Sequence, residues 1–538
     1  MKMRMTTLAA AMLAMSGWAM AQDKAVPPAA EAIRAEAMLP PHGPQGRPLP
    51  LVAHWHRRSM PLSWQIEQIR DGHHMLPWTP YKRNMDAAAA QSIEPEIRQL
   101  AEWGLPFVLL TGGQWEADFY SSDEYKQLPA HETGVGVSAK SGNKINAVSP
   151  FSPVEPWREL GRKWTDIGFT DRLQQLYPDP PLVFFVSNNE AHDMRWHKAE
   201  ALQRYMEQYG EGHDGNFKRK VFGDGWIERY GAMIDGMRSG LDAPAWRDNS
   251  RFVAYNAFGA DHFGRWGGWV QYSLHTEDRV SWTWHAWEGG IPEAYDNHWE
   301  GGKRAYRLWS MQTEMMNLHF MKNYAFEADP DFWLEVIFWD GYLPGKSNNK
   351  RKQYAEDGME YTPALYRGWT QYVMWTLTPR VAREWRASAF DKENWQEYFD
   401  EIVNSVDLVY ADPVLTRFWR KGELVANPER KHPFQSAVPE KFQDEPRWFH
   451  LPTSTDPSGS WELSSEIPVY SLARTIGDRP NREWLVYAHA PKGAREEVTV
   501  TIPDYRRITV DVPVEGAFHH VREGSDEVTQ VGDHAQLR

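Results

Sequence analysis

Short uncharged segments and longer mixed segments follow one another along residues 50–385. The uncharged segments are rich in β-branched and aromatic side chains, as at 182–187 (LVFFVS), and they predict strands buried on both faces of a parallel sheet. The mixed segments, such as 92–103, place apolar residues three or four positions apart and predict helices. Strands that alternate with helices indicate βα units. About eight such units favour a closed (β/α)8 TIM barrel over an open doubly wound sheet.

The expected barrel strands are bounded by turn residues such as Asp179 and Pro180. Polar and aromatic residues follow most of these strands, and α/β barrels carry their chemistry at the carboxyl ends of the strands. No GxGxxG or Walker-type loop follows the first strand, which disfavours nucleotide binding. Residues 64–81 have the character of an irregular loop. The expected strands lie at 50–56, 107–111, 145–148, 182–187, 251–256, 280–288 and 332–341, with the eighth at either 372–377 or 381–385.

The pattern changes after residue 428. Residues 429–445 are charged and punctuated by proline, as in a linker, and later segments alternate apolar and polar positions, for example at 498–502 and 508–512. Period-two alternation between closely spaced turns predicts a small antiparallel β-sandwich. We expect it to support the barrel, because it shows no evident row of aromatic side chains. The expected division is 1–21 signal peptide, 22–47 flexible leader, 48–430 catalytic barrel, 431–445 linker and 446–538 β-sandwich.

The amino-terminal segment predicts export. Lys2 and Arg4 precede an uncharged run at 7–15, and Ala19-Met20-Ala21 fits the small-x-small rule for signal-peptide cleavage. The run is too short to anchor the chain in a bilayer, so we expect a periplasmic or secreted protein. The chain contains no cysteine, which excludes disulfides, thiol catalysis and Cys-ligated zinc.

Charge and aromatic content narrow the class of partner. The formal charge is −14 and the lysines and arginines form no stripe, so we expect neither nucleic acid nor an anionic membrane as a partner. The chain has 28 tryptophans, 22 tyrosines and 22 phenylalanines, whose apolar faces and polar edges suit the C–H faces and hydroxyl groups of sugars. A carbohydrate is therefore the expected substrate. Nothing in the sequence indicates the oligomeric state.

Asn189 and Glu190 come directly after the strand at 182–187. A strand that ends in Asn-Glu resembles the fourth strand of the large clan of retaining (β/α)8-barrel glycoside hydrolases. The resemblance covers the barrel, about residues 48–430, at the level of the clan and not of a family. It implies that Glu190 is the general acid/base, that Asn189 contacts the sugar 2-hydroxyl, and that a second carboxylate lies on strand seven.

Glu335 is the expected second carboxylate, because it lies in the apolar strand at 332–341, where an ionisable group is costly unless it is paired or functional. Glu288 and Asp340 are the alternatives. If strand seven runs on to Trp339, Glu335 lies deep and Asp340 becomes the carboxylate at the rim. The resemblance implies a retaining mechanism with two carboxylates. The residues expected to bind substrate follow several strands in succession: His54, His56, Trp115, Asn189, His192, Tyr255, His262, Trp284, His285 and Trp339.

Three other functions remain as alternatives. His54 and His56 resemble the first-strand histidine pair of barrel metallohydrolases, but no matching aspartate follows strand eight, so we expect neither a catalytic metal nor a cofactor. A polysaccharide lyase would use a Tyr or His base, and a non-catalytic carbohydrate-binding protein would need the aromatic side chains alone. Histidines and arginines near the strand ends favour an anionic, algal-type glycan. The sequence does not indicate the sugar, the linkage, or endo versus exo cleavage.

Overall fold

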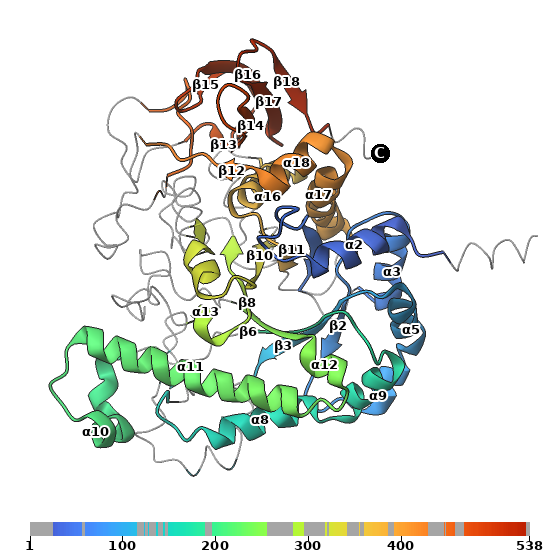
Figure 1. Ribbon diagram of the computed structural model, residues 1–538, viewed down its shortest axis with the longest axis vertical. Helices are drawn as coiled ribbons and strands as arrows, with labels where there is room; N and C mark the ends of the chain where they lie inside the picture. The colour runs from blue at the N-terminus through green and yellow to red at the C-terminus, as the bar shows by residue number, and fades with distance from the viewer. Residues whose placement is uncertain are drawn as a thin grey trace, which may run out of the picture.

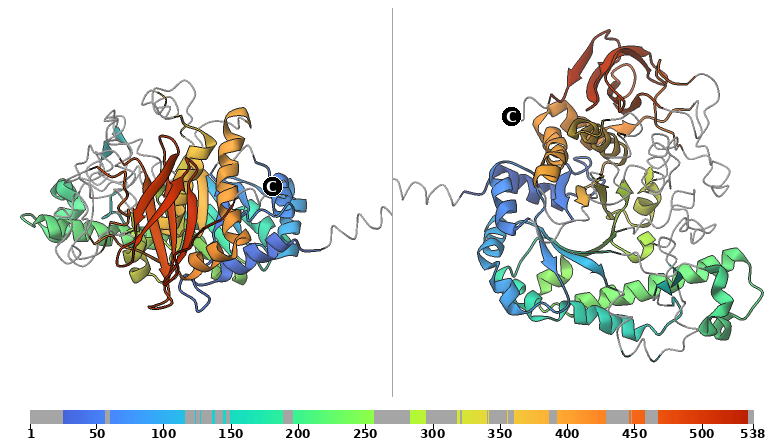
Figure 2. Two further views of the ribbon diagram at one scale, coloured as in Figure 1. Left: turned by 90° about the horizontal axis from the view of Figure 1, so that it is seen from above. Right: turned by 180° about the vertical axis from the view of Figure 1, so that it is seen from behind.

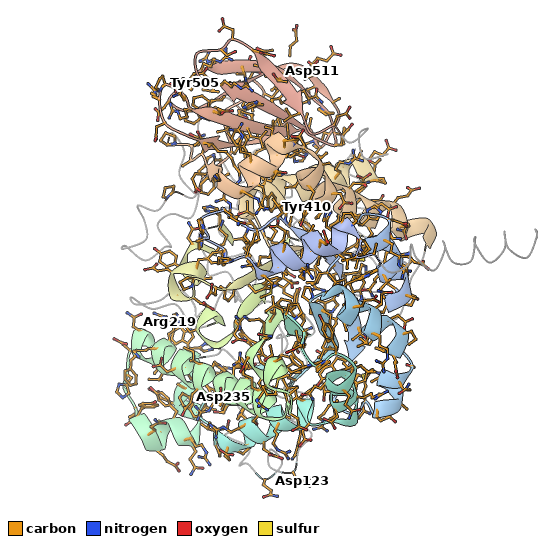
Figure 3. All side chains as sticks on the ribbon, turned by 45° about the vertical axis from the view of Figure 1, so that its right-hand side comes forward. Asp123, Arg219, Asp235, Tyr410, Tyr505 and Asp511 are labelled. Atoms are coloured by element: carbon orange, nitrogen blue, oxygen red, sulfur yellow. The ribbon has the colours of Figure 1, made fainter. Side chains whose placement is uncertain are left out.

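The computed structural model consists of a barrel and a β-domain at its carboxyl-terminal end (Figure 1). Side chains fill both parts, with Tyr505 and Asp511 in the β-domain at one end of the molecule and Asp235 on helix α11 at the other (Figure 3). The structure describes residues 25–55, 60–115, 149–188, 196–255, 283–294, 322–339, 360–385, 392–428, 448–457 and 467–533, with short pieces at 123, 127, 136–137, 144–145, 318–319, 341, 355 and 446.

Within the described residues, eight parallel strands form a nearly closed barrel. They stand around it in sequence order, and β11 pairs with β1. The Val52 N–H donates to the His74 carbonyl at 2.9 Å, and the Val52 carbonyl accepts from the Leu76 N–H at 2.8 Å, which joins β1 to the segment just before β2. The predicted TIM barrel is confirmed. Its strands are β1 (Leu51–His54), β2 (Trp78–Tyr81), β3 (Phe107–Gln114), β6 (Val183–Asn188), β7 (Ser250–Tyr255), β8 (Gly289–Ile291), β10 (Trp333–Trp339) and β11 (Val381–Trp385).

Helices cover the outside of the barrel, and α8 and α11 run alongside each other at the end far from the β-domain (Figure 2). Local signals set their ends: the Asp214 side chain caps α11 by accepting from the Phe217 N–H, and Gly104 ends α5 in a left-handed conformation at φ 62°. No helix in the described part of the chain has the length and apolar character needed to span a bilayer. The helices are α2 (Pro28–Met38), α3 (Leu62–Arg70), α4 (Ala87–Gln91), α5 (Glu94–Trp103), α8 (Glu155–Thr165), α9 (Gly168–Leu176), the 3-10 helix η1 (Trp196–Ala201), α10 (Gln203–Tyr209), α11 (Gly215–Ser239), α12 (Pro244–Asp248), α13 (Thr283–Ala286), α16 (Pro363–Leu377), α17 (Lys392–Ala411) and α18 (Pro413–Lys421).

The second barrel strand, β2, lies where the sequence predicted an irregular loop. It contains Pro80, and proline removes one hydrogen bond from a β-ladder. The main-chain N–H and carbonyl of Trp78 bond to the Gln65 side chain at 2.8 and 3.0 Å, on the edge of β2 away from β3. Pro80 has the same orientation as Trp78, two residues earlier, so its missing N–H costs no bond to β3. The segment expected as strand two is therefore strand three.

Two further strand predictions are wrong. Of the segment expected as strand three, the structure describes Ile145, which lies in β5 (Lys144–Ile145) and pairs with β4 (Gly136–Val137) in a sheet separate from the barrel. Residues expected in strand six form α13, and strand six is β8, continued by β9 (Glu293–Ala294). A Cβ on Gly289 would lie 2.5 Å from the Trp333 carbonyl oxygen and 2.9 Å from Val253 Cγ2, so only glycine leaves room for Trp333 here. The eighth strand is β11, and the alternative at 372–377 lies in α16.

The leader expected to be flexible over 22–47 contains helix α2. Ala30 and Ile33 on one face of this helix are fully buried. Glu36 accepts from the Leu49 N–H at 2.8 Å and forms an ion pair with Arg420 of α18. Its alanines favour the helical conformation, and burial of one face holds the helix against the barrel. The prediction of a flexible leader is therefore wrong for residues 28–38.

Two antiparallel sheets make up the carboxyl-terminal β-domain in the described residues. A five-stranded sheet has the order β12-β13-β14-β17-β18, and β15 and β16 form a second sheet. Buried apolar side chains such as Val486, Val500 and Val510 pack between them, which confirms the predicted β-domain and its period-two pattern. The strands are β12 (Glu423–Leu424), β13 (Tyr470–Ile476), β14 (Glu483–His489), β15 (Arg495–Thr501), β16 (Arg507–Val512), β17 (Ala517–Arg522) and β18 (Val528–Val531).

The β-domain contacts the barrel through the end of helix α16. Arg474 on β13 donates to the Trp375 carbonyl at 2.8 Å and to the Thr376 carbonyl at 3.4 Å. Lys322 donates to the Leu377 carbonyl at 3.3 Å. The last carbonyls of a helix lack intrahelical partners and form the negative end of its dipole. Burial lowers the pKa of both side chains, and their N–H groups satisfy the last carbonyls of α16 at the point where barrel and β-domain meet.

We expect the protein to lose stability as the pH falls below about 6.5, the ordinary pKa of histidine. Burial lowers the pKa of His489 to about 3 and that of His519 to about 4. Between these values and 6.5 the unfolded chain binds protons that the folded chain does not, so stability decreases with falling pH. Each histidine should cost about 1.4 kcal/mol between pH 7.5 and 5.5. Urea unfolding at the two pH values measures the loss.

The variant His489→Phe should reduce this pH dependence, because the ring lies among aromatic side chains and titrates only in the unfolded chain. The control is His285→Gln, since the His285 side chain is exposed. A wild-type protein with equal unfolding free energy at pH 7.5 and 5.5 would contradict the prediction. The neighbours of the His489 ring are Trp369, Tyr372, Tyr470 and Tyr487.

Candidate active site

A contact across the barrel shows which side chains point inward. The rings of Trp333 on β10 and Phe184 on β6 have centroids 4.4 Å apart, although these strands are not neighbours in the sheet. Both rings therefore point into the barrel. Side chains alternate along a strand, so Glu335, Ile337 and Trp339 also point inward.

Four aromatic side chains lie at the carboxyl ends of strands one, five, seven and eight, and we call Trp55, Tyr255, Trp339 and Trp385 the mouth aromatics. Trp55 lies 5.9 Å from Tyr255 and Trp339 lies 5.7 Å from Trp385, measured between ring centroids. Trp55 and Trp385 are half-buried, whereas the other two are buried. Amphipathic rings at the end of a barrel are suited to stack on sugars. Sequence reasoning singled out Tyr255 and Trp339 and missed the other two.

Glu335 forms an ion pair with Arg383 deep in the barrel. One carboxylate oxygen accepts from Arg383 Nε at 2.6 Å and the other from Trp333 Nε1 at 3.0 Å. Both charged side chains are fully buried, and Arg383 also donates to the His54 carbonyl at 3.0 Å. Strand seven runs on to Trp339, so Glu335 lies four residues, or about 13 Å of extended chain, below the end of the strand.

Glu293 is a second inward carboxylate, nearer to the carboxyl ends of the strands. It follows β8 in strand six, pairs in register with Ile337, and is 1 % exposed. The Tyr255 hydroxyl donates a short hydrogen bond to it. Sequence reasoning missed Glu293 because strand six was placed at 280–288. An available signal was its position directly after the short segment Gly289-Gly-Ile-Pro292, which a correct placement of strand six would have marked as a strand end.

Glu288 lies at the opposite end of strand six from the one expected. Strand six begins at Gly289, so Glu288 precedes it. The carboxylate accepts from Arg238 of α11 and, at 3.0 Å, from the Phe252 N–H. Glu288 therefore joins the amino ends of two barrel strands to the outer helix α11. This position does not favour Glu288 as a catalytic alternative.

His54 and Trp115 face the helix layer and not the barrel interior. The His54 ring packs against Phe399 of α17, with centroids 5.4 Å apart, and His54 Nε2 lies 3.3 Å from a carboxylate oxygen of Glu384. Trp115 is fully buried, with its ring 6.3 Å from that of Trp164 on α8. Both were expected to bind substrate, and the outward direction of their side chains contradicts that expectation.

Several predicted site residues lie outside the described residues, and their roles stay predictions. His285 is described; it lies exposed in α13, before strand six. Trp284 belongs to the same helix, but its side chain is not described. The remaining residues outside the description are Glu190, Asp340, His56, Asn189, His192 and His262.

The metallohydrolase alternative requires the first-strand histidines to face a metal in the barrel. His54 does not do so, because it lies against α17. In the part of the chain that the structure describes, no three His, Asp or Glu side chains are placed to hold a metal ion. The geometry therefore gives this alternative no support.

Comparison with known proteins adds a remote likeness to solved structures. No family model matches the chain. No curated protein matches its sequence. A solved structure of a double variant of the GH36 α-galactosidase AgaA from Geobacillus stearothermophilus, in complex with raffinose, is similar with a TM-score of 0.35 and 9% identity. The match covers 94% of this chain and 57% of that one.

Proposed function

We propose that the chain is an exported glycoside hydrolase that cleaves a polysaccharide or oligosaccharide with two carboxylates. The observation that supports this proposal is the composition of the barrel interior. Glu293 and Glu335 point into a barrel that carries four aromatic side chains at the carboxyl ends of its strands, which is the end where barrel enzymes carry their chemistry. Hydrolysis of a glycosidic bond requires one protonated and one ionised carboxyl group, and stacking on aromatic rings would hold the sugar.

Glu190 is the proposed general acid/base. β6 ends at Asn188, at the carboxyl end of the barrel, and Glu190 follows two residues later in the sequence. A residue in this position would protonate the leaving oxygen and later remove a proton from water. The resemblance to the retaining clan supports a two-step path. An anionic glycan is the proposed substrate class, because histidines and arginines follow several strands.

The variant Glu190→Ala tests this role. Loss of the acid should slow hydrolysis of natural glycans by roughly 10²–10⁴-fold. Aryl glycosides with good leaving groups should be affected far less, because such groups leave without protonation. The assay is reducing-end release from a broad panel of polysaccharides, with product stereochemistry followed by NMR.

The matched control is Glu211→Ala, at an exposed position in the described residues. Equal loss on activated and natural substrates would contradict the assignment of Glu190. A wild-type chain that releases no reducing ends from any member of the panel would contradict the proposed function. Unsaturated products that absorb ultraviolet light would instead identify a lyase.

A further inference from the structure

The Trp55 and Tyr255 rings meet across the barrel. Trp55 directly follows strand one and Tyr255 ends strand five. In the order of the sheet these two strands lie four places apart, and therefore on opposite walls of the barrel. Their ring centroids are nevertheless only 5.9 Å apart. Contact between opposite walls means that these two side chains fill the barrel at this height.

The register of the sheet places both rings in one layer. Following paired residues around the sheet from Tyr255 leads to Leu51 on strand one, and Trp55 lies four residues further along that strand. A closed barrel of eight strands with a shear of eight shifts by about four residues between opposite strands. Trp55 and Tyr255 therefore form one layer of inward side chains, which we call the floor.

Arg383 and Glu335 lie on the inner side of the floor. Arg383 is in register with Ala53, two residues before Trp55, and its Cζ lies 6.0 Å from the centroid of the Trp55 ring. Arg383 Nε donates to Glu335 at 2.6 Å, and neither side chain has any exposed surface. The inner side of the floor is therefore closed to solvent.

Trp385 and Glu293 lie on the outer side of the floor. Trp385 follows Arg383 by two residues at the end of strand eight. Glu293 follows Ile291 by two residues, and Ile291 is the register partner of Tyr255. Both side chains project inward nearer to the carboxyl ends of the strands than the floor does. The outer side of the floor thus faces the end of the barrel at which barrel enzymes bind their substrates.

Trp55 is the floor residue with surface to offer to a ligand. It is half-buried, whereas Tyr255 is 5 % exposed. No acceptor in the described residues takes a hydrogen bond from the Trp55 indole N–H. An indole with an apolar face and an available N–H suits a sugar ring, which presents C–H groups on its face and hydroxyl oxygens at its rim.

We propose that the floor is the base of the substrate site and that Trp55 is the residue on which a sugar ring of the glycan stacks. This inference rests on the proposed function. Three contacts hold the Trp55 ring for this role. Its main-chain N–H donates to the Glu384 carbonyl at 2.8 Å, Tyr255 packs against it from the opposite wall, and the Arg383 guanidinium lies over it from the inner side.

The test compares Trp55→Leu with Trp55→Phe. Both variants keep an apolar side chain in the floor, so both should fold, but only phenylalanine keeps a flat ring. On the best substrate of the wild-type chain, Trp55→Leu should raise KM by roughly 30-fold, the order of loss when a tryptophan at the centre of an interface is truncated. Its kcat should change little, because stacking holds the ground state and the transition state alike. Trp55→Phe should keep most of the affinity.

The matched control is Trp64→Leu. Trp64 is also half-buried, but it lies on α3 outside the barrel, with its ring centroid 6.4 Å from that of Phe399. This variant should keep the wild-type KM. Circular dichroism and urea unfolding check that each variant is folded.

A second measurement needs no turnover. In affinity electrophoresis, gels that contain each polysaccharide of the panel should retard the wild-type chain, Trp55→Phe and Trp64→Leu in at least one case. The same gel should retard Trp55→Leu far less, because this variant has lost the ring on which the sugar stacks.

The outcomes separate this inference from the proposed function. An active wild-type chain whose folded Trp55→Leu variant keeps the wild-type KM and retardation overturns the inference and leaves the proposed function intact. An equal loss in Trp64→Leu also overturns it, because the effect is then not specific to the floor. Retardation that depends on Trp55, in a wild-type chain that releases no reducing ends, supports the inference and contradicts the proposed function.

Discussion

Arg383→Met should destabilise the protein by about 3–5 kcal/mol, because it leaves Glu335 as an uncompensated buried charge. Neither side chain of the pair has any exposed surface. Among the described residues, the carboxylate would then keep only the hydrogen bond from Trp333 Nε1, and water has no direct access to either side chain. Chemical denaturation followed by circular dichroism measures the change in the free energy of unfolding.

The double variant Glu335→Leu/Arg383→Met is the matched control for the single substitution. Replacing both partners of a buried pair by apolar residues of similar size is often neutral or stabilising. We therefore expect the double variant to recover most of the lost stability. If Arg383→Met lowered the free energy of unfolding by less than about 1 kcal/mol, the result would contradict an ion pair shielded from water.

Gly236→Ala in helix α11 should destabilise the protein because the added Cβ has no room. A Cβ at Gly236 would lie 1.9 Å from the Arg158 carbonyl oxygen of α8, and one at Gly161 would lie 1.9 Å from the Met233 carbonyl oxygen of α11. The two helices thus approach backbone to backbone at a pair of glycines. Alanine in either place must push the helices apart, which costs about 1–3 kcal/mol for an overpacked contact, despite the better helix propensity of alanine.

Gly231→Ala is the matched control in the same helix, since a Cβ there meets no atom within 4 Å. It should stabilise the protein by up to about 1 kcal/mol, because alanine favours a helix over glycine by that amount. The two substitutions therefore have opposite expected signs. Thermal and urea unfolding of the three proteins compare them directly. A Gly236→Ala variant as stable as Gly231→Ala would show that α8 and α11 separate without cost.

The sequence alone determined the kind of fold and most of its strands. Apolar runs bounded by turns predicted strands one, four, five and seven correctly, because a strand buried on both faces tolerates few polar residues. For strand eight, one of the two predicted segments was correct. The alternation at 498–502 and 508–512 likewise revealed the carboxyl-terminal β-domain, whose sheets bury one face each. These signals are local, so they can be read without knowing which distant residues pack against the segment.

Tertiary structure decided strands two and six, where the local signal was misleading. Pro80 belongs to a strand because its missing N–H faces an edge with no strand partner in the described residues. Gly289 can pair with Trp333 in the sheet because it has no Cβ to collide with the Trp333 carbonyl oxygen. Neither fact can be read from the residues around the position, since both depend on a partner distant in sequence.

Tertiary structure also decided which side chains belong to the candidate site. His54 and Trp115 follow the predicted pattern of polar and aromatic residues at strand ends, yet both face the helices. Glu293 drew no attention, yet it faces inward beside Tyr255. The direction of a side chain reverses with a shift of one residue in register. The sequence therefore indicated the end of the barrel that carries the site, and only the register of the closed sheet determined which residues meet there.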